Sequence, residues 1–203
     1  ITLGKSPYFA YRSEGVVHCG HPDVPQTCYQ CDMRPQLQPV APSIDDPIEL
    51  LQACHDKVRR FAALTVRLRA HLADRGADDQ AQEAAKSILR YFDVAAPLHH
   101  EDEDMDLFPA LRALGHTDLN ARIDELQAQH DSLGRLWQAL RPWLMAVSAG
   151  QPHEIPAEAD DFAIAYPAHA AREESEIYPA ASQLSTAAVQ RISEAMVRRR
   201  TAS

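Results

Sequence analysis

The chain has 203 residues, of which 45% are hydrophobic and 24% charged, and its formal net charge is −9. This length and balance predict one ordinary globular domain with a small appendage. Nucleic-acid binding needs a basic face, so the acidic charge argues against a nucleic-acid partner. No apolar run approaches the ~20 residues of a transmembrane helix and no signal peptide is visible, so we expect a cytoplasmic protein without a membrane anchor.

The N-terminal segment differs from the rest of the chain because it is rich in proline and holds three of the four cysteines. We therefore predict two parts, a Cys/His-rich segment at 1–43 and a helical domain at 44–203. The stretch "HCGHPDVPQTCYQC" supplies three thiolates and an imidazole, which is a donor set for one tetrahedral zinc ion. The candidate zinc ligands are Cys19, His21, Cys28 and Cys31. Two alternatives stay open: a redox-active Cys28–Cys31 pair, or cysteines without a special role.

From residue 47 onward, apolar residues recur at spacings of three and four, which is typical of amphipathic helices. The pattern predicts four long helices and a short fifth one, at about 47–74, 79–114, 117–149, 157–182 and 185–199. Long helices joined by short connections predict an all-α fold, an up-down-up-down four-helix bundle with a short C-terminal helix.

The helical part of the chain repeats itself. The stretch "APLHHEDEDMDLFPA", which begins at Ala96, aligns with "YPAHAAREESEIYPA", which begins at Tyr166, at an offset of 70 residues. The stretch "LQACHD", which begins at Leu51, aligns with "LQAQHD", which begins at Leu126, at an offset of 75. The repeat selects six residues that can bind a metal: His55, His99, Glu103, His130, His169 and Glu173.

Residues four apart lie on one face of a helix, so His99 and Glu103 form a two-ligand clip, and the second half holds a matching clip. The other two selected histidines lie in apolar seams, where the core of a bundle is expected. Mixed imidazole and carboxylate donors suit a pair of first-row metal ions, iron best of all, whereas zinc would prefer four ligands for each ion. The alternative is a structural bundle without metal, in which the histidines are ordinary core residues.

Four other histidines have no counterpart in the repeat and are predicted to lie on the surface: His71, His100, His116 and His153. Asp56 and Asp131 follow the seam histidines and either orient their imidazoles or belong to a solvated face; the second reading is preferred. Cys54 is predicted to be a packed side chain. The basic run "VRRRT" near the C-terminus is interpreted as complementing the dipole of the last helix.

The order H…HxxxE…H…HxxxE, with "LFP" and "IYP" after the clips, resembles the hemerythrin-like cation-binding domain over about residues 44–184. The resemblance implies a four-helix bundle that holds a non-haem di-iron centre bridged by Glu103 and Glu173. Oxygen-carrying hemerythrins have a further histidine at the position of Gly134 and an aspartate at the position of Glu174. The ligand pattern is therefore closest to that of bacterial di-iron proteins that repair iron centres under nitrosative or oxidative stress.

The resemblance implies five-coordinate irons that share the carboxylates and an oxide or hydroxide bridge. Without a histidine at Gly134, both irons are expected to accept small ligands, unless the glycine only permits close helix packing. We expect a protein that reacts with nitric oxide, peroxide or oxygen, with redox enzyme activity left open. The alternative is an oxygen carrier or sensor of the hemerythrin type. Expected partners are an electron donor or iron-acceptor protein and a second copy of the chain in a homodimer.

Overall fold

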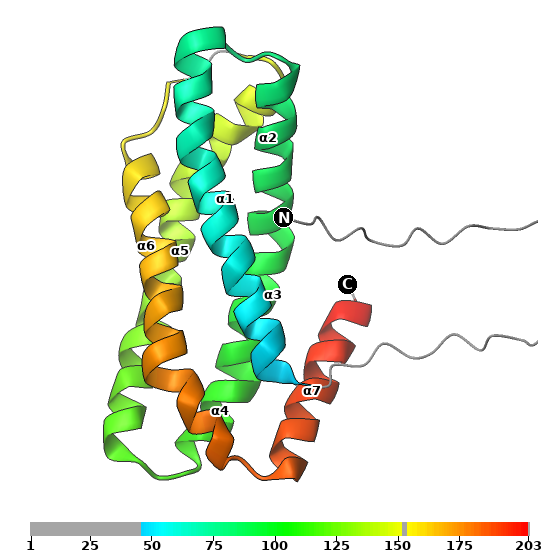
Figure 1. Cartoon of the computed structure of the whole chain (residues 1–203), viewed down its shortest axis with the longest axis vertical. Coiled ribbons are helices and arrows are strands. Elements are labelled where there is room, and N and C mark those ends of the chain that lie inside the picture. The colour runs from blue at the N-terminus through cyan, green and yellow to red at the C-terminus, as the bar shows by residue number, and fades with distance from the viewer. Residues whose placement is uncertain (1–45, 152–153, 203) are drawn as a thin grey trace, which may run out of the picture. The chain divides into compact units, whose positions relative to one another are not determined.

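A computed structural model describes residues 46–151 and 154–202 of the chain (Figure 1). Within these ranges the ordered elements are all helices, so the predicted all-α class is confirmed. None of these helices is both long enough and apolar enough to cross a membrane. The predicted N-terminal segment, with its zinc candidates Cys19, His21, Cys28 and Cys31, lies outside the described residues, as does His153.

The first half of the bundle is α1 followed by a long return through several short elements. These are α1 (Pro47–Arg75), α2 (Asp79–Arg90), η1 (Tyr91–Ala95), α3 (Ala96–Asp102), η2 (Glu103–Leu107) and α4 (Phe108–Arg112). The second half repeats this path, and a last helix follows it. Its elements are α5 (Thr117–Ser148), α6 (Glu158–Arg172), η3 (Glu173–Ile177), η4 (Tyr178–Gln183) and α7 (Thr186–Thr201).

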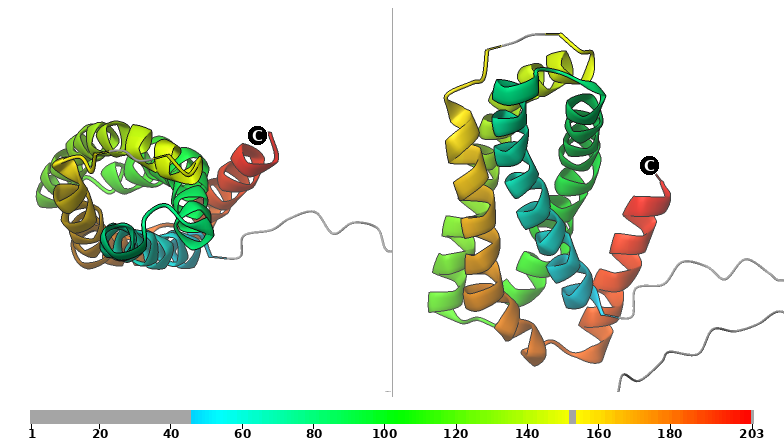
Figure 2. Two further views of the ribbon diagram at one scale, coloured as in Figure 1. Left: turned by 90° about the horizontal axis from the view of Figure 1, so that it is seen from above. Right: turned by 45° about the horizontal axis from the view of Figure 1, so that its top comes forward.

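The four long helical segments run up, down, up and down around a common interior, as predicted (Figures 1 and 2). α7 leaves the end of the bundle and turns back along its side (Figure 2). Local chemistry marks the helix starts: the Asp46 carboxylate accepts hydrogen bonds from the backbone N–H groups of Ile48 and Glu49, while Pro47 occupies the first turn. Gly76, with φ +72°, ends α1 in a conformation that other residues rarely adopt.

The predicted second and fourth helices are not continuous α-helices. The backbone N–H of Phe108 bonds to the carbonyl of Glu103, and the N–H of Tyr178 bonds to that of Glu173, so each clip glutamate begins a wide π-helical turn. Pro109 follows the first of these turns. Since proline has no N–H and its ring crowds the carbonyl four residues earlier, a regular α-helix would be strained there. The "LFP" and "IYP" motifs therefore mark the ends of the widened turns.

Two apolar clusters fill the interior of the bundle. One contains the large buried rings of Phe92, Trp143 and Phe162. The other lies toward α7, whose Ile192 and Met196 pack into it. A layer of polar residues separates the clusters on each long segment. On α5, for example, one cluster includes Leu126 and the other Leu133, and His130 stands between them.

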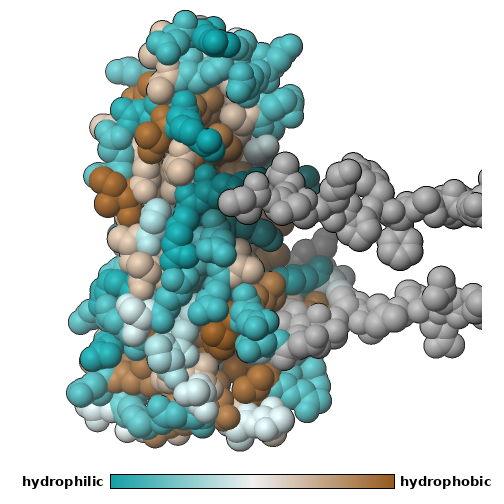
Figure 3. Space-filling model, viewed as in Figure 1, coloured by the Kyte–Doolittle hydropathy of each residue, from teal (hydrophilic) through white to brown (hydrophobic). Residues whose placement is uncertain are grey.

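The outer surface is mainly polar on the face shown in Figure 3, with hydrophobic residues interspersed. The large exposed hydrophobic side chains of the described residues come from five different elements: Val66, Val94, Met105, Met145 and Ile164. The expected homodimer stays a prediction.

Candidate metal centre

The structure brings all six repeated histidines and glutamates into the polar layer between the two apolar clusters. None is more than 8% exposed, and both glutamates are fully buried: His55, His99, Glu103, His130, His169 and Glu173. Buried carboxylates and imidazoles need compensation by hydrogen bonds, opposite charge or a metal ion. This layer is therefore the candidate site.

The donor atoms form two groups. In the first, one ligand atom from each of His55, His99, Glu103 and Glu173 lies within 4.8 Å of the others. The two imidazole Nε2 atoms are 3.0 Å apart, and the Nε2 of His55 is 3.2 Å from Oε2 of Glu173. Neighbouring donors on one metal ion, with bonds of ~2.1 Å, also lie roughly 3 Å apart. This group thus has the spacing of a ligand set.

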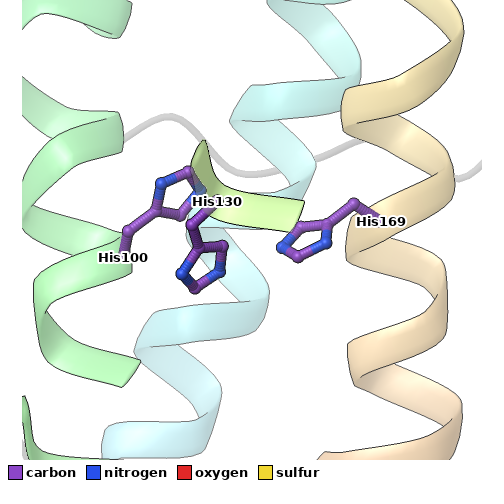
Figure 4. A group of neighbouring side chains, drawn as sticks. All are labelled: His100, His130 and His169. Carbon is purple, nitrogen blue, oxygen red and sulfur yellow. The ribbon is translucent and has the colours of Figure 1, made fainter. Parts of the chain in front are cut away.

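The second group consists of His100, His130 and His169, whose donor nitrogens also lie within 4.8 Å of one another. Figure 4 shows the three rings approaching one another from three different helical segments. The prediction that His100 is a surface residue is wrong: its side chain is partly buried and stacks on His130, with ring centroids 4.1 Å apart. The repeat could not reveal it because its counterpart is Ala170. The pair "HH" was the signal, since adjacent residues are only about 100° apart around a helix.

The two glutamates lie between these groups. The Nε2 atom of His130 is 3.7 Å from Oε2 of Glu103 and 3.5 Å from Oε1 of Glu173. The Nε2 atom of His169 is 2.9 Å from the same Oε1 atom of Glu173. Both carboxylates therefore adjoin both groups, which is the placement that bridging ligands need.

Several of these buried atoms lack a hydrogen-bond partner among the described residues. They are Oε2 of Glu103, both carboxylate oxygens of Glu173, and the Nε2 atoms of His130 and His169. The imidazoles approach Glu173 closely, but not in the direction of a hydrogen bond. An unpaired buried polar group costs on the order of 1–3 kcal/mol, so a cation bound here would satisfy several groups at once. The residues present thus fit a cation-binding role.

The outward-facing nitrogens of three imidazoles have partners. His55 Nδ1 lies 3.0 Å from Oε1 of Glu174. The other carboxylate oxygen of Glu174, Oε2, accepts a hydrogen bond from Arg59 at 2.6 Å. When Nδ1–H donates to a carboxylate, the lone pair stays on Nε2, which faces the site. Glu174 therefore orients His55 and does not belong to either donor group.

His130 and His169 are held in the same way. His130 Nδ1 lies 3.1 Å from the carboxylate oxygens of Asp104, and His169 Nδ1 lies 3.1 Å from Oε1 of Gln129. Sequence reasoning missed Asp104, although it aligns with Glu174 at the same offset of 70 residues. Asp56 and Asp131, in contrast, are exposed, which agrees with the preferred interpretation that they belong to a solvated face.

The pKa values of the two glutamates are shifted in opposite directions. Burial and the neighbouring Glu173 raise the pKa of Glu103 well above its usual value. Burial alone would also raise the pKa of Glu173, but the nearby imidazoles outweigh it and hold that pKa well below the usual value. The charged form of Glu103 is therefore disfavoured in the protein by itself, and a bound cation would favour it.

The histidines also differ. Burial and the neighbouring imidazole of His55 lower the pKa of His99 to about 3, and burial lowers that of His100 well below its usual value. Both are therefore neutral imidazoles with a free lone pair at pH 7. Burial would lower the pKa of His130 too, but Asp104 and Glu173 raise it to about 9. Metal binding at His130 would thus displace a proton.

Tyr178, from the "IYP" motif, is a further polar side chain at the centre. Its hydroxyl donates to Oε1 of Glu103 at 2.6 Å and lies 3.3 Å from the Nε2 atom of His55. Burial and the two glutamates raise its pKa well above the usual value, so the phenol keeps its proton. The sequence motif marked this residue, but only the structure shows that it faces the first donor group.

The structure also tests the predictions for Gly134, for Cys54 and for two histidines outside the repeat. A Cβ atom added to Gly134 would meet nothing within 4 Å, so the alternative that this glycine permits close helix packing is wrong. Cys54 is buried, as predicted. The surface prediction holds for His116, which is exposed, but is wrong for His71, which is 19% exposed and lies 2.8 Å from Asp78.

The basic run "VRRRT" does more than complement a helix dipole. Arg199 and Arg200 of α7 form ion pairs with Asp102, a fully buried carboxylate next to Glu103 in the chain. Arg199 also binds Asp106 at 2.7 Å. These pairs attach α7 to the segment that carries the first clip.

A helical bundle with a buried layer of histidines and glutamates defines a class of cation-binding proteins. Residues 46–181 match the family model described as the Hemerythrin HHE cation binding domain, and the chain belongs to this family. An uncharacterized protein of Haemophilus influenzae is 39% identical to the chain over 111 residues. The match covers 55% of this chain and 64% of that protein, so the chain matches less than two thirds of the relative's length.

Proposed function

We propose that the buried centre holds two iron ions and that the protein reacts through them with small oxidants, namely nitric oxide, peroxide or oxygen. The observation that supports this proposal is the arrangement of two donor groups on either side of two shared carboxylates, Glu103 and Glu173. Mixed imidazole and carboxylate donors suit iron, although the four donors of the first group would also suit zinc. Two iron ions bound there would supply one-electron redox chemistry and positions for small ligands.

The protein contributes orientation, exclusion of water and a proton. Glu174, Asp104 and Gln129 fix three imidazoles with Nε2 directed inward. The apolar clusters on both sides of the layer limit access of water to it. Tyr178 holds a proton on its hydroxyl oxygen beside Glu103 and His55, where a reduced oxidant would need one.

The first experiment measures metal content. Protein purified from an iron-replete host should carry two irons per chain, and the double variant Glu103→Gln/Glu173→Gln should carry fewer. The exposed Glu83→Gln, 72% exposed, is the matched control. The proposal fails if the native protein contains only zinc, or no metal, under these conditions.

A second experiment identifies the reaction. Sustained consumption of peroxide or nitric oxide by the iron-loaded protein would support a stress-response or repair function. A reversible oxygen adduct that survives many cycles without such turnover would instead support the second candidate, an oxygen carrier or sensor. His100 is the observation that favours this second candidate, because it adds a fifth histidine to the centre.

Location and partners are part of the proposal. We propose a cytoplasmic protein that receives electrons from a donor protein or passes iron to an acceptor. The predicted N-terminal zinc site also stays a proposal. It is tested by whether Cys28→Ser removes one zinc per chain without loss of iron.

A further inference from the structure

His100 belongs to the polar layer although the internal repeat does not include it. Its ring stacks almost parallel to His130, at an interplanar angle of 8°, and its centroid lies 6.0 Å from that of His169. Within the described part of the chain, neither ring nitrogen of His100 makes a hydrogen bond, unlike the outward-facing nitrogens of His130 and His169. Its nitrogens therefore remain available to another partner.

The donor nitrogens of His100, His130 and His169 form a group of three (Figure 4). The opposite group contains only two histidines, His55 and His99, with the carboxylates of the layer. The counterpart of His100 in the second half is Ala170, so within the described residues the repeat supplies no matching third imidazole to the opposite group. The two halves of the centre are thus chemically different.

We propose that His100 is a third nitrogen ligand of the metal position formed by His130 and His169, which makes the dinuclear centre asymmetric. This inference rests on the proposed function, since it concerns the same pair of metal ions. Gly134 lies one helical turn after His130 and offers no donor. The third nitrogen on this side of the centre comes instead from α3.

The asymmetry has a consequence for external ligands. A third imidazole fills a position on the side of His130, and the side of His55 and His99 keeps fewer nitrogen donors. A small anion should therefore bind once per centre, on the side of His55 and His99.

Stacking on His130 offers a purely structural explanation of His100, and two variants separate the two roles. His100→Phe retains an aromatic ring for stacking but removes the nitrogen donor. His100→Ala removes both and leaves a space that free imidazole can enter. His71→Ala is the control, because this partly buried histidine pairs with Asp78, away from the donor groups.

Iron retention is measured by competition with a chelator, and anion binding by optical titration with azide, after circular dichroism has established that each variant folds. We expect both His100 variants to release one of the two irons at least about tenfold more readily than native protein and His71→Ala. We also expect azide to bind twice per centre instead of once. Added imidazole should reverse both changes in His100→Ala alone.

The inference is overturned if both His100 variants retain iron and bind azide like native protein. It is also overturned if His100→Phe behaves like native protein and only His100→Ala differs, since stacking is then sufficient. If native protein carries no iron, the proposed function itself fails. Native protein with two irons and unchanged variants would leave the proposed function intact and refute only the role of His100.

Discussion

The imidazole Nδ1 of His130 lies 3.1 Å from the carboxylate of Asp104, and each residue comes from a different half of the internal repeat. The contact has a counterpart between His55 and Glu174, at 3.0 Å. Asp104 aligns with Glu174, and His130 with His55. Each half of the bundle therefore supplies the carboxylate that orients a histidine of the other half.

This exchange leads to a prediction about metal affinity. Asp104→Asn and Glu174→Gln should each weaken iron binding by about 10- to 100-fold, because a neutral amide accepts the Nδ1–H bond more weakly than a carboxylate and does not increase the basicity of the imidazole. Chelator competition on the folded, iron-loaded variants measures the effect. Asp131→Asn and Asp56→Asn are matched controls, since both aspartates adjoin the seam histidines in sequence but are exposed. Equal losses in controls and variants would show that the orienting contacts are unimportant.

The repeat explains why much of this centre could be predicted from the sequence. Spacing predicted the bundle, and the two alignments selected six side chains that the structure brings into one layer. Residues that break the repeat escaped this reasoning. His100 aligns with Ala170, so the repeat gave no reason to expect a metal ligand at position 100. Gln129, which orients His169, aligns with Cys54, so the repeat did not indicate it either. In agreement with this difference, the Nδ1 atom of His99, the counterpart of His169, has no hydrogen-bond partner among the described residues.

Other features depend on three-dimensional packing that periodicity cannot express. Burial of Asp102 follows from the return of α7 along the bundle, some 97 residues later in the chain. The π-helical turns at Glu103 and Glu173 add one residue to a helical turn, which shifts the register that a regular spacing assumes. Each π-turn leads into a proline motif visible in the sequence, but the proline alone does not specify the type of turn.

Gly134 allows a prediction about stability. Gly134→Ala should increase the free energy of unfolding by about 0.5–1 kcal/mol, because the position is helical and an added Cβ meets no atom within 4 Å. Gly76→Ala is a matched control. It has equal space, but its φ of +72° disfavours a side chain, so this change should destabilise the protein. Urea denaturation measures both, and a loss of stability in Gly134→Ala would contradict the prediction.

The attachment of α7 allows a second stability prediction. Replacement of both Arg199 and Arg200 by alanine leaves the fully buried carboxylate of Asp102 without these partners, which should cost about 3–5 kcal/mol. Arg198→Ala is the control, since Arg198 is 70% exposed and its loss should change stability by no more than about 0.5 kcal/mol. Urea denaturation again provides the measurement. Similar values for the double variant and the control would show that α7 is held by its apolar contacts alone.

The burial of Glu103 beside Glu173 predicts that Glu103→Gln changes the stability of the protein in opposite directions without metal and with bound metal. Burial and Glu173 raise the pKa of Glu103, which means that its charge is unfavourable in the protein by itself. Glu103→Gln should therefore increase the stability of chelator-treated protein, by on the order of 1 kcal/mol, since a neutral amide retains the bond from Tyr178 without the charge.

In the presence of ferrous iron, under anaerobic conditions, native protein should be more stable than Glu103→Gln. Metal that binds only the folded state stabilises it by about 2.7 kcal/mol at a concentration 100 times its dissociation constant, and the variant should lose most of this gain. Unfolding curves with chelator and with iron measure both effects, with Glu83→Gln as the exposed control. Equal stabilisation of native protein and Glu103→Gln by iron would exclude Glu103 from the metal centre, whereas a destabilised chelator-treated variant would show that its charge is already compensated by the protein.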